Sequence, residues 1–173
     1  MIVLCFRRGA VETRTFWRIS MALRQLHGPR FALALGLVAG LAGIALAATP
    51  DELYEKREAG MKANGAALKA LAAAAKAGTI TPEDVAKAQG LVDVANTLPE
   101  LFTEGSITPK SRALPEIWSN KAGWDEKLTA FQAAADTVLA SAKSGDPAAL
   151  GVAVDKAGEA CGACHKIFRG PEK

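Results

Sequence analysis

The sequence is poor in the residues from which most metal centres and catalytic sites are built. Its 173 residues include only three cysteines and two histidines. It shows no paired carboxylates beside a spare histidine, no nucleophile with a neighbouring base and no phosphate-binding loop, so we do not expect an enzyme. Aromatic residues make up only 6%, and runs of β-branched residues are scarce. This alanine-rich composition favours helices over strands.

A long apolar run lies near the beginning of the chain. Residues 30–48 read RFALALGLVAGLAGIALAA and carry no charge after Arg30, and Arg24 lies just upstream. The run ends on the small residues Ala45-Leu46-Ala47. A basic lead, an apolar middle and an A-x-A ending are typical of a secretory signal peptide. A retained membrane anchor is the alternative, because the run is close to the minimum length that spans a bilayer.

These features predict a leader over residues 1–47, cleaved on export to the periplasm, and a mature domain over residues 48–173. A signal peptide that began at Met21 would be of ordinary length, so Met21 is an alternative start. The leader would remove Cys5 and His27, which leaves two cysteines and one histidine in the mature chain. We expect no stable membrane insertion once the leader is cleaved.

The positive charge of the full chain comes from this leader. The whole sequence has a formal net charge of +3, whereas residues 48–173 carry 15 Lys and Arg against 17 Asp and Glu, a net charge of −2. Nucleic-acid binding needs a basic surface. The mature domain is therefore not expected to bind nucleic acid.

Helix boundaries are well marked in the mature chain. Thr49, Thr81 and Asp146 each stand directly before a proline. Their side chains can accept from a free backbone amide, and proline loses no hydrogen bond at the first helical position. Asn120 marks a fourth start, and glycines mark the stops. The predicted helices cover residues 50–76, 82–97, 120–143 and 146–169.

The last two predicted helices carry apolar stripes at helical spacing. The stripes consist of Trp124, Leu128, Phe131, Ala135 and Val138 in one helix, and of Leu150, Val154, Ala157, Cys161, Cys164 and Phe168 in the other. Such stripes and short connections predict an all-α, antiparallel four-helix bundle. The link from Leu98 to Trp118 is the exception, and a loop of that length is expected to cross the bundle or to serve a ligand site.

The chemistry of the mature chain is concentrated in the run Cys161-Gly162-Ala163-Cys164-His165, near the end of the last helix. On a helix, residues three and four apart share a face. Cys161 and Cys164 can therefore form thioethers with the two vinyl groups of one haem, and His165 can ligate its iron. Cys-x-x-Cys-His is the attachment motif of c-type haem.

Three other readings of this run are less consistent with the sequence. A zinc site needs about four ligands, and the mature chain has no further cysteine or histidine. A thioredoxin-like dithiol is expected to open a helix in a βαβ setting, whereas this one ends a helix. A disulfide between residues three apart on a helix would close a very small ring.

Four stretches of the mature chain resemble, in the right order, the class II c-type cytochromes, which are the cytochrome c-prime family and its low-spin relatives. The stretches are KREAGMK at 56–62, LPELF at 98–102, PEIW at 115–118 and CGACHKIFR at 161–169. The resemblance implies an antiparallel four-helix bundle with the haem-attachment motif on the C-terminal helix. It also implies one covalently attached haem c per chain.

The resemblance implies roles for three further residues. Arg57 matches an arginine that lies near a haem propionate. Met61 matches a position whose side chain covers the open face of the iron, either as a ligand or only as a lid, and both readings stay open. Arg169 matches a basic residue beside the proximal histidine, although a cation at a helix C-terminus is favourable in any case.

Two functions are compatible with these residues. We expect a periplasmic single-electron carrier with His165 and Met61 as axial ligands, which would exchange electrons with redox partner proteins. A five-coordinate protein that binds nitric oxide or carbon monoxide is the alternative. Members of the family often form homodimers through the first two helices, and the alanine-rich faces here would permit it.

Overall fold

The computed structural model describes residues 47–172. The predicted leader apart from Ala47, the alternative start at Met21, and Cys5 and His27 all lie outside the described residues. No helix in the described part is both long enough and apolar enough to cross a membrane.

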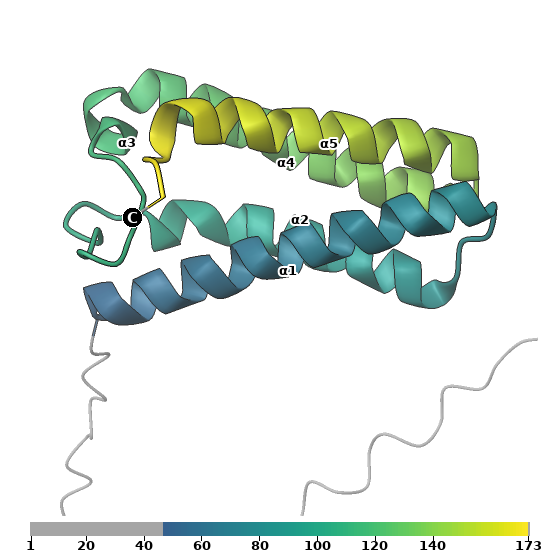
Figure 1. The fold of residues 1–173 in the computed structure, drawn as a ribbon, viewed down its shortest axis with the longest axis horizontal. Helices are drawn as coiled ribbons and strands as arrows, with labels where there is room; N and C mark the ends of the chain where they lie inside the picture. The colour runs from purple at the N-terminus through teal and green to yellow at the C-terminus, as the bar shows by residue number, and fades with distance from the viewer. Residues whose placement is uncertain (1–46, 173) are drawn as a thin grey trace, which may run out of the picture. The chain divides into compact units, whose positions relative to one another are not determined.

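Four long helices and one short one make up the described chain (Figure 1). The long helices are α1 (Pro50–Ala77), α2 (Pro82–Leu101), α4 (Lys121–Ser144) and α5 (Pro147–Phe168), and the short one is α3 (Glu116–Ser119). Consecutive long helices run antiparallel, and each packs against two others: α1 on α2 and α5, and α4 on α2 and α5. The predicted all-α, antiparallel four-helix bundle is confirmed.

The local capping signals act where the sequence predicts them. The hydroxyls of Thr49 and Thr81 each accept from the backbone three residues on, and the carboxylates of Glu52 and Asp84 accept from the capping residue in return. Asp146 accepts from two backbone amides at the start of α5. Each arrangement satisfies donors that a helix start otherwise leaves free, which explains why the predicted starts agree with the structure.

The end of α2 differs from the prediction, because the helix continues through Pro99 to Leu101 instead of ending at residue 97. Proline has no N–H to donate to the carbonyl four residues earlier, which belongs to Ala95. The Gln132 side chain on α4 donates to that carbonyl at 3.4 Å. A neighbouring helix thus replaces the missing donor, and the long link shrinks to residues 102–115 followed by α3.

The apolar core consists of two clusters of buried side chains. The larger cluster runs through α1, α2, α4 and α5, and the smaller one consists of Ile117, Trp124 and Phe168. Cys161 packs against the larger cluster and Cys164 against the smaller one, while Phe102 touches both. The predicted stripes of α4 and α5 are buried, apart from the two cysteines, which are half-buried. The cysteines therefore lie where the two parts of the core approach each other.

Candidate cofactor site

A cavity of about 490 Å³, open to solvent on one side, lies between the helices of the bundle. Its walls come from α1, α2, α4, α5, the short helix α3 and the loop over residues 102–115. All six predicted site residues line it: Arg57, Met61, Cys161, Cys164, His165 and Arg169. A volume in the range of about 300–1,000 Å³ is typical of ligand and cofactor pockets. The helix packing thus brings residues from the two ends of the mature chain to one cavity.

The α5 wall presents two thiols and one imidazole. Cys161 and Cys164 are half-buried and form no disulfide. Burial raises the pKa of both thiols, and the nearby Cys161 raises that of Cys164 further. Both side chains are therefore protonated thiols at neutral pH in the unmodified chain.

His165, also half-buried, follows Cys164 directly. Burial lowers the pKa of its imidazole, and the positive charges of Arg169 and Arg112 lower it further. The ring is therefore neutral at pH 7, which is the form that can ligate a metal through a ring nitrogen.

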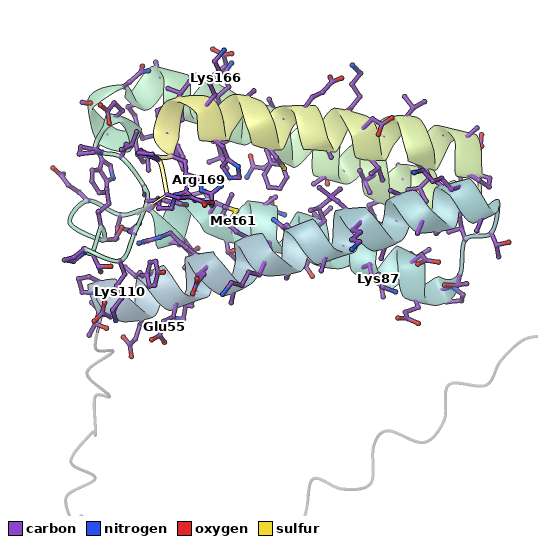
Figure 2. The ribbon with its side chains drawn as sticks, in the orientation of Figure 1. Glu55, Met61, Lys87, Lys110, Lys166 and Arg169 are labelled. Carbon is purple, nitrogen blue, oxygen red and sulfur yellow. The ribbon has the colours of Figure 1, made fainter. Side chains whose placement is uncertain are left out.

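The α1 wall presents Met61 to the same cavity. Figure 2 shows Met61 and Arg169 between α1 and α5, whereas Lys166 points away from the bundle. Met61 is partly buried against the larger core cluster. A thioether from α1 and an imidazole from α5 thus line one cavity, and both groups can ligate haem iron.

Arg57, one turn before Met61, is 4% exposed and is held by the end of α2 and the loop that follows it. Its guanidinium donates to the Leu101 carbonyl at 2.6 Å, to the Ser106 carbonyl at 2.8 Å and to the Ser106 hydroxyl at 3.1 Å. It also lies 4.9 Å from the centre of the Phe102 ring. No carboxylate of the described chain forms a salt bridge with it, so this side chain brings an uncompensated positive charge to the cavity wall.

The end of α5 is fastened to the long loop next to the cavity. Leu114 donates from its backbone to the Phe168 carbonyl, and Gly170 donates to the Arg112 carbonyl at 2.7 Å. The Arg112 side chain donates in turn to the Gly170 carbonyl. Arg169 lies within this connection, where it is exposed. The loop thus serves the ligand site, which is one of the two roles that its length predicts.

Asn64 also lines the cavity, three residues after Met61, and is 5% exposed, although it was not among the predicted site residues. Its position on the inner face of α1 could have been read from the spacing of Arg57, Met61 and Leu68. Lys127 and Phe102 also line the cavity. Phe102 belongs to the LPELF stretch that carries the family resemblance, whereas nothing in the sequence context of Lys127 singles it out, because its place depends on how separate helices pack.

The glycines beside Met61 have different surroundings. A Cβ on Gly60 would lie 3.0 Å from a methyl group of Val94 on α2. Gly60 therefore allows a close crossing of α1 and α2. A Cβ on Gly65 would meet no atom within 4 Å, and Gly65 lines the cavity.

The fold and the site define an all-α bundle with a cofactor pocket between its helices. Residues 52–169 match the family model described as Cytochrome C'. The chain therefore belongs to the cytochrome c' family, the class of c-type cytochromes with covalently attached haem c.

Proteins named cytochrome c-556 and cytochrome c' are similar to this chain over most of their own length. The chain is 38% identical over 119 residues to cytochrome c-556 of Agrobacterium tumefaciens (strain II Chrys), which covers 66% of this chain and 94% of the relative. It is 31% identical over 128 residues to cytochrome c' of Rhodospirillum rubrum, which covers 73% of this chain and 87% of the relative.

Solved structures of the family share the bundle. A nitric oxide complex of a mutant cytochrome c prime from Alcaligenes xylosoxidans is 26% identical with a TM-score of 0.64, covering 72% of this chain and 98% of that one. Cytochrome c' from Rubrivivax gelatinosus is 27% identical with a TM-score of 0.60, covering 70% and 97%.

The residues that line the cavity fit a haem. Two thiols three residues apart lie on the helix face that borders the cavity, with an imidazole beside them. A buried arginine without a carboxylate partner suits an anionic group such as a propionate. The apolar side chains of α1 and α4, among them Leu68, Leu128 and Phe131, suit the faces of the porphyrin.

Proposed function

We propose that the protein is a periplasmic single-electron carrier in which Cys161 and Cys164 hold the haem, and His165 and Met61 are its axial ligands. The observation that carries this proposal is the cavity with His165 on its α5 wall and Met61 on its α1 wall. Bound haem would supply one-electron exchange between ferric and ferrous iron. No catalytic group is assigned, and we do not propose an enzyme.

The α5 residues would attach and orient the group. Thioethers at Cys161 and Cys164 would tie the ring to both parts of the core, because each cysteine packs against a different cluster. His165 needs no proton to be removed at neutral pH, because its pKa is already lowered by burial. Arg169, one turn later, adds a positive charge near the imidazole.

The α1 residues would complete the site. A thioether is a good ligand for ferrous haem, and a His/Met pair raises the reduction potential. Arg57 would face a propionate while three of its hydrogen bonds hold the end of α2 and the loop after it. The arginine would then join the carboxylate, the loop and α1.

Gas binding is the second candidate function. The similar mutant cytochrome c prime from Alcaligenes xylosoxidans forms a nitric oxide complex. In this reading Met61 would only cover the iron, and nitric oxide or carbon monoxide would enter beneath it. The two functions therefore differ in whether the Met61 sulfur is bound.

An absorption spectrum of the purified holoprotein tests the choice. We expect a low-spin ferrous spectrum, a weak far-red band from methionine-to-iron charge transfer in the ferric form, and poor carbon monoxide binding. Met61→Ala should give a high-spin spectrum and rapid carbon monoxide uptake. Leu68→Ala is the matched control, because Leu68 lines the same wall without a sulfur, and it should stay low-spin.

A high-spin wild type that binds carbon monoxide would refute the electron-carrier proposal and favour gas binding. Mass spectrometry of the exported protein tests the attachment separately. The expected mass is that of a chain that begins near Ala48 plus one haem, retained in acid-acetone. Haem lost to the solvent, or a disulfide in its place, would contradict attachment at Cys161 and Cys164.

A further inference from the structure

One buried polar atom in the cavity wall has no partner. The Asn64 side-chain nitrogen is covered from solvent and makes no hydrogen bond, a condition that only one other side-chain atom of the described chain shares, the Thr108 hydroxyl. Asn64 lines the cavity, whereas Thr108 is outside its lining. A buried amide without an acceptor destabilises a fold, and an apolar side chain of the same shape would avoid that cost.

The position of Asn64 on α1 indicates which acceptor it can reach. A helix rises about 1.5 Å per residue, so Asn64 lies about 4.5 Å beyond Met61 along the axis, and Arg57 lies about 6 Å on the other side of Met61. Residues three apart share a face. The amide is therefore next to the Met61 side chain and away from the end of the cavity where Arg57 lies.

We propose that Asn64 is a positioning residue for Met61: its side-chain N–H donates to the Met61 sulfur when that sulfur ligates the iron. A thioether sulfur is a weak acceptor, and a buried donor with no competing acceptor is suited to it. The inference rests on the proposed function, because it needs Met61 at the iron.

Two consequences follow for the bound state. The hydrogen bond would fix the orientation of the thioether and so slow its replacement by another ligand. It would also place the positive end of the N–H dipole near the iron, which disfavours the ferric charge and raises the reduction potential. In Asn64→Leu the leucine also lowers the local polarity, which by itself moves the reduction potential upward. A net fall in the potential therefore shows that the lost donor has the larger effect, whereas replacing a residue that only fills space gives no fall.

The test compares the Asn64→Leu holoprotein with the wild type. We expect a lower reduction potential, a weakened far-red band in the ferric form, and a ferrous affinity for carbon monoxide about two- to tenfold higher, the effect of one lost hydrogen bond. Thr108→Val is the matched control, because it removes the other unpartnered buried group, and it should change none of the three. Asn64→Ala also lacks the donor and gives the same test if leucine does not fit.

A double-mutant cycle shows whether Asn64 acts through Met61. In a Met61→Ala background, Asn64→Leu should leave the carbon monoxide affinity unchanged. An effect that persists there would overturn the inference, because Asn64 would then act on the bound gas. A low-spin wild type with an unchanged or raised potential in Asn64→Leu would overturn the inference alone, whereas a high-spin wild type would refute the proposed function and the inference with it.

Discussion

Removing the haem attachment should remove the fixed packing of the bundle. The change is the double substitution Cys161→Ala and Cys164→Ala, which leaves the cavity of about 490 Å³ without its covalently held group. An enclosed empty cavity costs about 24 cal/mol per Å³, so this pocket would cost about 12 kcal/mol if it were closed and dry. That value is an upper bound, because water can enter between the charged residues of the walls.

The cost is as large as the whole stability of a typical domain, which is about 5–15 kcal/mol. Even a fraction of this upper bound is a large share of that stability, so we expect α1 and α5 to move toward each other in the haem-free chain and to lose fixed side-chain packing. The helices themselves should persist, because their caps are local. Retained secondary structure with loosened packing is the pattern of a molten globule.

Circular dichroism and thermal unfolding measure this outcome. The far-ultraviolet signal should remain mostly helical, and the near-ultraviolet signal should fade, because Trp124 lines the cavity and packs on Phe102 and Phe168 at 4.9 and 5.3 Å between ring centres. The wild-type chain produced without haem is the control and should behave in the same way. A haem-free variant that unfolds as sharply and at as high a temperature as the holoprotein would refute the reasoning.

Three further predictions concern individual contacts. Gly60→Ala should destabilise the protein by up to about 2 kcal/mol in denaturant unfolding, because the overlap with Val94 costs about 1–3 kcal/mol and alanine returns about 1 kcal/mol of helix propensity. Val94→Ala should relieve the overlap. Arg57→Met should cost about 2 kcal/mol and speed hydrogen exchange at the end of α2 and in the loop after it, because the Leu101 and Ser106 carbonyls lose their donor. Unchanged exchange would contradict this role. Hydrogen bonds from the Thr81 hydroxyl and backbone amide lower the pKa of Asp84. The stabilisation that these bonds give the folded protein is therefore present above the ordinary aspartate pKa and is lost as the pH falls through the lowered value. Thr81→Ala should therefore lower the free energy of unfolding by about 1 kcal/mol at pH 7 and by less in acid. An equal loss at both pH values would show that the ionised Asp84 carboxylate does not contribute.

The helices and the attachment motif could be read from the sequence because each depends on nearby residues. A cap such as Thr49 with Glu52 is formed within one turn. Cys161 and Cys164 share a face because of helix geometry alone. The family resemblance added Arg57, Met61 and Arg169 as site candidates, and all three line the cavity.

The rest depends on contacts between helices far apart in the sequence. α2 continues past Pro99 because Gln132, 37 residues from Ala95, supplies a donor. Arg57 finds its acceptors 44 and 49 residues away, and no local pattern encodes that pairing. The helix starts and the residues that can hold a haem could be predicted from the sequence, since both follow from interactions within a few turns. The burial of Asn64 without a hydrogen-bond partner could not, because burial is a property of the packed helices together.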